Sequence, residues 1–184
     1  QMCIRDRTAP EKGNSNYADL KMTSEKIMQK EFKKSETIPV IARVAPIYYA
    51  EYTQNLRDRV FDAKENVAYI FNDGEYGFSF CRVVNLIDFI NGIINVPSGR
   101  YEGIYNLADS RLITAKEIID YEKEHHRIGA VIQKSPGMGL SINKGKMKTD
   151  YRYFDPSITF NNWNIDNTRA KRIAPFRWTL SNTK

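Results

Sequence analysis

Cysteine and histidine are scarce in this chain. Its 184 residues contain two cysteines, Cys3 and Cys81, at no metal-ligand spacing, which excludes a disulfide framework and a cysteine-based metal centre. The two histidines, His125 and His126, are adjacent, so on a helix they point about 100° apart and cannot chelate one metal ion together. We therefore expect no metal site and a reducing, cytoplasmic setting.

The chain also lacks a long hydrophobic run. Its longest apolar-rich stretch, residues 83–96, is interrupted by Asn85, Asp88 and Asn91, and it is shorter than the roughly 20 residues that a membrane-spanning helix needs. No segment has the charged, apolar and small-residue order of a secretory signal. We therefore expect no membrane partner.

Charge of one sign does not dominate either. The net charge is +6, but 28 basic residues are mixed with 22 acidic ones, and the densest basic run, Lys144 to Lys148, is short. Such a run is typical of a solvated loop, so we expect no nucleic-acid partner. Residues 1–7 (QMCIRDR) show no periodicity and lead directly into a turn-rich stretch. We interpret them as a non-native, adapter-like scar and start the fold at residue 8.

From there on, helices and strands alternate. Helical periodicity and start signals predict helices over residues 17–34, 55–64, 84–95, 115–124 and 167–172. Short apolar or β-branched runs predict strands over residues 38–44, 67–71, 78–83, 103–107 and 130–134. Thr114 and Glu117 have the spacing of a capping box, and residues 135–150, rich in Gly and Lys, read as a loop. The alternation indicates an α/β fold.

Tyr17 and Lys21 are the candidate chemical pair. They are four residues apart, so on a helix they lie on one face, one turn from each other. A nearby ammonium favours the phenolate and lowers the tyrosine pKa from its ordinary value of about 10. Such a tyrosine can act as general acid or base on a carbinol or carbonyl oxygen.

The context of this pair resembles the extended short-chain dehydrogenase/reductases, or NAD-dependent epimerase/dehydratase family. The family pattern reads roughly N-x-Y-x-x-S-K-x-x-x-E, then R-P-x-N-V-Y-G, F-V-H-V-D-D-L-A, G-x-Y-N-I with T-x-x-E-L, and D-x-S-K-A. The similar segments occur here in the same order, at residues 14–25, 43–49, 80–87, 103–107 with 114–118, and 166–171.

The resemblance implies a role for five residues. Tyr17 would be the catalytic acid/base, and Lys21 would tune it and bind the nicotinamide ribose. Ala45 would lie against the nicotinamide, and Pro46 and Ile47 would line the substrate pocket. The implied cofactor is NAD or NADP, and the implied substrate is a sugar, usually nucleotide-linked, that is epimerised, dehydrated or reduced through hydride transfer.

The chain departs from the family pattern at several positions. Pro46 replaces the Asn of R-P-x-N, Asn85 replaces an acid, and Phe78 stands where many members place a phosphate-binding Arg. Two alternatives therefore stay open: a dehydrogenase or reductase of a hydroxysteroid-like or flavonoid-like alcohol, and a catalytically inactive nucleotide-sensing module of the same fold.

The resemblance also implies how the chain is organised. Residues 8–184 would form the C-terminal part of a doubly wound, Rossmann-like parallel sheet plus a small α/β substrate-binding lobe, the lobe coming mainly from about residues 50–100 and 126–184. The Gly-rich loop and the catalytic Ser or Thr of the family would precede Tyr17, so we expect this fragment to be inactive alone. We expect a homodimer for the whole enzyme.

Overall fold

The computed structural model describes residues 16–33, 35–62, 66–96, 100–134 and 164–182. The expected scar at 1–7 and the expected loop at 135–150 lie outside them. The helices are α1 (Asn16–Phe32), α2 (Gln54–Arg57), α3 (Val83–Ile94), α4 (Ala115–Glu124) and two short 3-10 turns, η1 (Ala170–Arg172) and η2 (Leu180–Asn182). The strands are β1 (Val40–Val44), β2 (Ile47–Tyr48), β3 (Phe61–Asp62), β4 (Val67–Phe71), β5 (Gly77–Phe78), β6 (Cys81–Arg82), β7 (Gly103–Leu107), β8 (Ile113–Thr114) and β9 (Ala130–Lys134).

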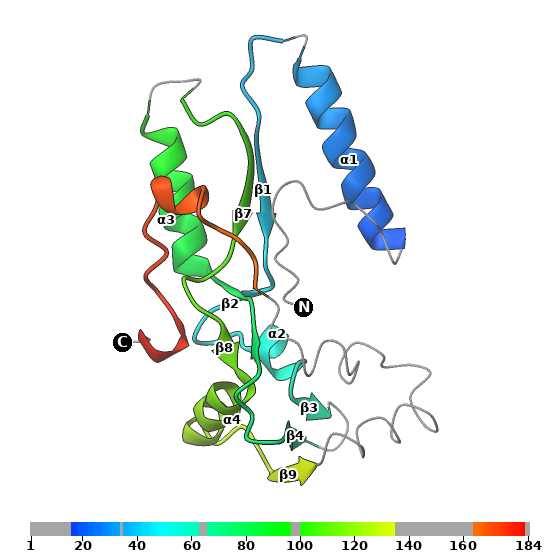
Figure 1. Ribbon diagram of the computed structural model, residues 1–184, viewed down its shortest axis with the longest axis vertical. Coiled ribbons are helices and arrows are strands. Elements are labelled where there is room, and N and C mark those ends of the chain that lie inside the picture. Colours follow the sequence, from blue (N-terminus) through cyan, green and yellow to red (C-terminus); the bar gives the residue numbers. More distant parts are fainter. Residues whose placement is uncertain (1–15, 34, 63–65, 97–99, 135–163, 183–184) are drawn as a thin grey trace.

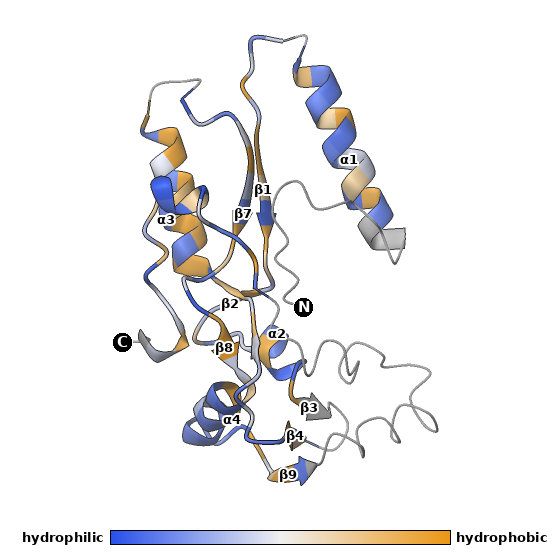
Figure 2. Cartoon of the chain, viewed as in Figure 1, coloured by the Kyte–Doolittle hydropathy of each residue, from blue (hydrophilic) through white to orange (hydrophobic). Residues whose placement is uncertain are grey.

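The upper part of the molecule is built on two parallel strands. β1 pairs with β7, and Val44 lies opposite Leu107 at the carboxyl ends. Figure 1 shows α1 and α3 on opposite sides of this pair. α3 is largely hydrophobic (Figure 2), and its Phe89 packs edge-on against Tyr105 of β7, with ring centroids 5.3 Å apart. A parallel pair flanked by helices confirms the predicted α/β, Rossmann-like class.

The lower part has its own core around β4. This strand lies between β3, which is antiparallel to it, and β9, which is parallel. Ile118 of α4 and Phe78 of β5 are buried in one hydrophobic cluster here, whereas α3 and the β1–β7 pair contribute to a separate cluster. The expected lobe boundaries, residues 50–100 and 126–184, stay a prediction.

The predicted helix over residues 55–64 is wrong in its second half. α2 ends at Arg57, and the chain then forms β3, where Phe61 pairs with Ala68 of β4. Tyr69 N–H also donates to Val60 O at 2.7 Å. Pairing with β4 thus overrides the local helical periodicity, because the ladder satisfies backbone groups beside a buried core.

The predicted strand over residues 78–83 is two strands. β5 pairs with β8, and β6 pairs in parallel with β2 in a different sheet. Ser79 and Phe80 lie between them without regular secondary structure, and α3 begins at Val83. The predicted helix over residues 167–172 is only the short turn η1. The sequence of residues 78–83 could not reveal that the two ends of this run pair with different strands, β8 and β2.

Strong local sequence signals predicted the bounds of helices and strands correctly. Glu117 N–H donates to Thr114 Oγ1 at 3.1 Å, and Thr114 N–H donates to Glu117 Oε2 at 2.9 Å, which confirms the capping box that starts α4. α4, β4, β7 and β9 have their predicted bounds. Among the residues that the structure describes, no helix combines the length and apolarity needed to cross a membrane.

Candidate functional site

The residues predicted to carry the chemistry come from α1 and the segment after β1. Tyr17 lies in the first turn of α1, where the structure describes its backbone alone, and Lys21 follows one turn later, exposed to solvent. Ala45 and Pro46 follow the carboxyl end of β1, and Ile47 begins β2. In open α/β sheets, ligands bind at this carboxyl edge of the strands.

An ion pair joins α1 to β1. Arg43 Nη2 lies 2.6 Å from Glu25 Oε1, and Arg43 Nε donates to Glu25 Oε2 at 3.0 Å. Both carboxylate oxygens take part, which is the fork geometry that makes arginine–carboxylate pairs strong and directional. Gln29 Nε2, one turn later on α1, also donates to Glu25 Oε1 at 3.1 Å. The contact fixes which face of α1 looks toward β1.

The same contact sets the level of the motif residues along the sheet. α1 and β1 run in opposite directions (Figure 1), so residues before Glu25 lie level with residues after Arg43. At about 1.5 Å rise per helical residue, Lys21 lies about 6 Å beyond the ion pair. At about 3.3 Å per strand residue, Ala45 lies about 6.6 Å beyond it in the same direction. Lys21 and Ala45 therefore reach the same edge of the sheet, and Tyr17 lies one turn further.

The segment that follows β1 is anchored through its backbone. Each of its three predicted site residues takes part in one hydrogen bond to a neighbouring element: Ala45 N–H to Leu107 O at 2.9 Å, Cys81 N–H to Pro46 O at 3.0 Å, and Asn55 Nδ2 to Ile47 O at 2.7 Å. Ala45 is buried, whereas Pro46 and Ile47 are half-buried. The segment is thus a fixed wall at the edge that Lys21 reaches.

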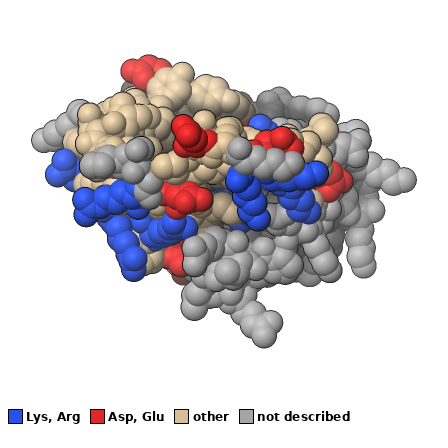
Figure 3. All heavy atoms as spheres, turned by 90° about the horizontal axis from the view of Figure 1, so that it is seen from above, with Lys and Arg blue, Asp and Glu red and all other residues tan. Residues whose placement is uncertain are grey.

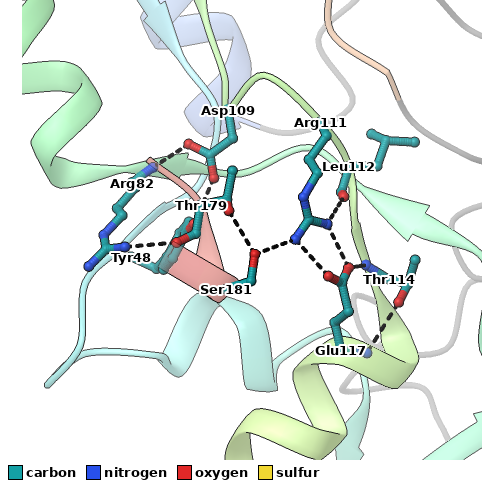
Figure 4. Close-up of polar contacts among 9 residues, drawn as sticks. All are labelled: Tyr48, Arg82, Asp109, Arg111, Leu112, Thr114, Glu117, Thr179 and Ser181. Carbon is teal, nitrogen blue, oxygen red and sulfur yellow. Dashed lines mark hydrogen bonds and ion pairs between the residues drawn. The ribbon is translucent and has the colours of Figure 1, made fainter. Parts of the chain in front are cut away.

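Behind this wall lies a buried polar cluster around Asp109 (Figure 4). Asp109 Oδ2 accepts a hydrogen bond from Tyr48 Oη at 2.7 Å. Its Oδ1 accepts from the Arg82 backbone N–H and from Asn85 Nδ2, both at 2.8 Å. The cluster links β2, the start of α3 and the chain after β7.

Burial sets the protonation of this cluster. It raises the pKa of the Asp109 carboxyl above its ordinary value, although the hydrogen bonds from Arg82, Tyr48 and Asn85 oppose the rise. Burial also raises the pKa of Tyr48, and the carboxyl of Asp109 raises it further. The Tyr48 hydroxyl therefore stays protonated and donates to Asp109. Burial likewise raises the pKa of Cys81 to about 12, so its thiol stays protonated.

Tyr48 and Asp109 were not among the predicted site residues. One signal in the sequence pointed to Asp109: it comes two residues after the end of the run that forms β7, at the edge where Ala45 lies. No signal pointed to the pair, because the two residues are 61 positions apart. They support the wall of the candidate site, since Tyr48 follows Ile47 directly.

A second polar group lies beside η2 and α4. Arg111 Nη2 lies 2.7 Å from Glu117 Oε1 and donates to Ser181 Oγ at 2.9 Å, as Figure 4 shows. Burial raises the pKa of Glu117, but the hydrogen bonds from Arg111 and Thr114 outweigh it, so this pKa lies below its ordinary value. This group links the C-terminal segment to α4.

The side chain of Phe78 packs in the hydrophobic cluster of the lower part. Its ring contacts Tyr76 and Phe80 at centroid distances of 5.8 and 6.2 Å, and it is buried. By the motif resemblance, many family members carry a phosphate-binding Arg at this position, and the Phe78 side chain offers no polar group there. Figure 3 shows basic and acidic side chains interspersed on the face seen from above, rather than a continuous basic surface.

Comparison with solved structures finds this fold in several enzymes. The chain is similar to a UDP-glucuronic acid 4-epimerase from Bacillus cereus in complex with NAD, with a TM-score of 0.65 and 15% identity. The match covers 100% of this chain and 54% of that one. It is similar to a Helicobacter pylori ADP-L-glycero-D-manno-heptose-6-epimerase (TM-score 0.62, 12% identity, 100% and 53% covered). It is also similar to an NAD-dependent NDP-hexosamine 5,6-dehydratase involved in tunicamycin biosynthesis (TM-score 0.56, 14% identity, 94% and 51% covered).

These likenesses establish the fold. No protein-family model matches the sequence, and no curated protein matches it. The chain has the fold of epimerases and dehydratases of the kind that the sequence motifs resemble, and it spans about half the length of the solved structures that it matches.

Proposed function

We propose that this chain carries the acid/base side of the active site in an NAD(P)-dependent enzyme that epimerises, dehydrates or reduces a sugar. One observation supports the proposal most: Glu25 of α1 and Arg43 of β1 are in contact at 2.6 Å. Counted from that contact by helix and strand rise, Lys21 and Ala45 lie at about the same level along the sheet. Ala45 follows the carboxyl end of β1, and that edge is where ligands bind in this fold class. The enzymes of the same fold named above support the reaction class.

Tyr17 is the proton acceptor in this proposal. As the sugar carbinol loses a hydride from carbon, its hydroxyl gives its proton to the Tyr17 phenolate, and the carbinol becomes a carbonyl. The nicotinamide, when bound, supplies the hydride acceptor. The Lys21 ammonium, one helical turn away, stabilises the phenolate and donates hydrogen bonds to the ribose. In the reverse direction the same phenol returns the proton to the carbonyl oxygen.

The described residues fit the nicotinamide end of NAD(P). Ala45 has a small side chain that adds little bulk beside a flat ring, and its backbone N–H is held by Leu107 O at 2.9 Å. Lys21 is exposed to solvent, and a lysine side chain is long enough to reach toward a ribose. The described residues include no Gly-rich turn between a strand and a helix, so they assign no pyrophosphate contact. NAD and NADP fit equally.

The buried Phe78 favours one second candidate. A nucleotide-linked sugar needs its phosphates bound, and the position used for that purpose in many family members is here packed against Tyr76 and Phe80. A hydroxysteroid-like or flavonoid-like alcohol carries no diphosphate and does not need that contact. The sugar remains the first candidate because the enzymes of the same fold named above act on sugars linked to nucleotides, by their names.

The test uses the protein encoded by the complete open reading frame that contains these residues. It is incubated with NAD or NADP and a panel of UDP-, ADP- and dTDP-linked sugars, and products are followed by NMR and by absorbance at the reduced nicotinamide band. We expect saturable nucleotide binding and conversion of at least one sugar. Turnover of a steroid or flavonoid alcohol alone would favour the second candidate, and nucleotide binding without turnover of any panel member would favour an inactive relative.

A further inference from the structure

α1 is held by little apolar packing in the described structure. Neither hydrophobic cluster contains a residue of α1, within the residues that the structure describes. Three of its large apolar side chains are exposed instead, Leu20 at 68%, Ile27 at 56% and Met28 at 44%. Among the described residues, polar contacts therefore carry a larger share of the attachment of α1 to the sheet.

The Glu25–Arg43 pair is placed to do this. The side chains of Arg43 and Glu25 are only 26% and 13% exposed, so water screens the pair less than it would an exposed one. Arg43 donates to both oxygens of the Glu25 carboxylate, and Gln29, one turn later on α1, donates a hydrogen bond to the same carboxylate. Arg43 stands two residues before Ala45, and Glu25 stands four residues after Lys21.

We propose that Glu25 and Arg43 are positioning residues that set the level of Lys21 and Tyr17 against Ala45. The inference rests on the proposed function, and it adds that the reaction depends on a contact between residues other than the Tyr17–Lys21 pair. A slide of α1 by one residue moves the tyrosine by about 1.5 Å. A misplacement of about 1 Å in a catalytic group can cost about 10²-fold in rate.

The main variant is Glu25→Gln in the complete enzyme. It keeps the shape of the side chain and removes the charge that holds the arginine fork. We expect kcat to fall by about 10- to 100-fold, with the KM for the sugar changed by less than about threefold, since the loss is in positioning and not in binding. The swapped pair, Glu25→Arg with Arg43→Glu, should recover part of the lost kcat.

The pH profile separates positioning from a direct charge effect. If α1 shifts, Tyr17 and Lys21 move together, because both lie on this helix; the tyrosine pKa then stays, and kcat falls at every pH without a shift of its pH profile. Removal of the Glu25 negative charge alone leaves the positive charge of Arg43 uncompensated and lowers the tyrosine pKa, so the rise of kcat moves to lower pH. The two causes thus predict different pH profiles.

Asp120→Asn is the matched control. Asp120 forms an ion pair with Lys116 on α4 at 2.8 Å, exposed and away from α1, so its loss should leave kcat and the pH profile unchanged. Arg43→Lys keeps the charge but loses the fork, and it replaces Glu25→Gln if that variant does not fold; we expect an intermediate kcat.

A lowered melting temperature with unchanged kcat and pH profile would overturn the positioning role and leave a purely structural pair. A wild-type enzyme that binds no nicotinamide nucleotide would instead overturn the proposed function itself, so the two failures are distinguishable.

Discussion

Tyr48 and Asp109, which are 61 residues apart, share a buried hydrogen bond of 2.7 Å. Tyr48 belongs to the hydrophobic cluster of the lower part, and Asp109 directly follows Ala108, which belongs to the cluster of the upper part. The bond therefore joins the two cores behind the Ala45–Ile47 wall. Because water is excluded there, the loss of one of these two side chains leaves the other without a replacement hydrogen-bond partner.

Tyr48→Phe tests this link because it removes only the hydroxyl. An unsatisfied buried acceptor costs about 1–3 kcal/mol, so we expect the free energy of unfolding to fall by that amount. Urea denaturation followed by tryptophan fluorescence measures it. Tyr52→Phe is the control, since Tyr52 is 42% exposed and its ring stacks on Tyr49; we expect less than about 0.5 kcal/mol there. Equal losses in the two variants would contradict the role given to the Tyr48–Asp109 bond.

The ionisation of Glu117 makes the stability of the fold depend on pH in the acid range. Its pKa in the folded chain lies below the ordinary value of 4.5, so its contribution to stability is complete above that value and is lost as the pH falls through the folded pKa. We expect wild-type protein to lose more stability than Glu117→Gln between about pH 5 and pH 3. Asp109 has a raised pKa and acts with the opposite sign, but it is present in both proteins and cancels in the comparison.

The measurement is urea denaturation of both proteins at several pH values in that range. Asp120→Asn is the control on the same helix, because Asp120 pairs with Lys116 at an exposed site, where an ion pair adds little. Parallel stability curves for wild type and Glu117→Gln would show that the contact with Arg111 does not lower the Glu117 pKa in solution.

The sequence predicted those elements whose cause is local. α4 has a capping box at its start, and β4 is followed by a turn signal at Asn72, where φ is +52°; both elements have their predicted bounds. The errors fall where a distant partner decides the structure. Phe61 was predicted to be in a helix but lies in β3, because it pairs with Ala68 of the antiparallel strand β4.

The candidate site divides in the same way. The spacing of Tyr17 and Lys21 on one helix face is a local property, and the family resemblance supplied Ala45 through its place after a strand. The Glu and the Arg of the motif were visible as residues 25 and 43, but periodicity along one segment cannot tell that their side chains meet. The Asp109 cluster needed the fold, since its members come from three separate segments.

Tyr17→Phe in the complete enzyme tests the proposed acid/base. The change keeps the ring and removes the group that transfers the proton, so turnover should fall by about 10²- to 10⁴-fold, the usual contribution of acid–base catalysis. Nucleotide affinity, measured by calorimetry, should change little. Tyr49→Phe is the control, because Tyr49 is 41% exposed and follows β2 in an isolated bridge with Tyr52. Unaltered turnover in the Tyr17 variant would remove Tyr17 from the mechanism.

The last prediction concerns β1 when these 184 residues are expressed on their own. Among the described residues β1 pairs with β7 alone, so the groups along its other edge have no strand partner there. Val44 on this strand is 37% exposed and Ile38, just before it, is 38% exposed. An apolar strand with an open edge is a template for pairing with another copy. We expect the chain to self-associate, as a mass above that of one chain in light scattering that grows with protein concentration.

A lysine on an edge strand opposes such pairing, so Val44→Lys should lower the measured mass toward that of one chain. Ile87→Lys is the matched control: Ile87 is 49% exposed on α3, and the change adds the same charge away from β1. If both lysines reduce association equally, net charge rather than the edge of β1 controls it. If neither does, association runs through another surface, and the exposed apolar face of α1 becomes the surface to mutate next, beginning with Leu20 and Ile27.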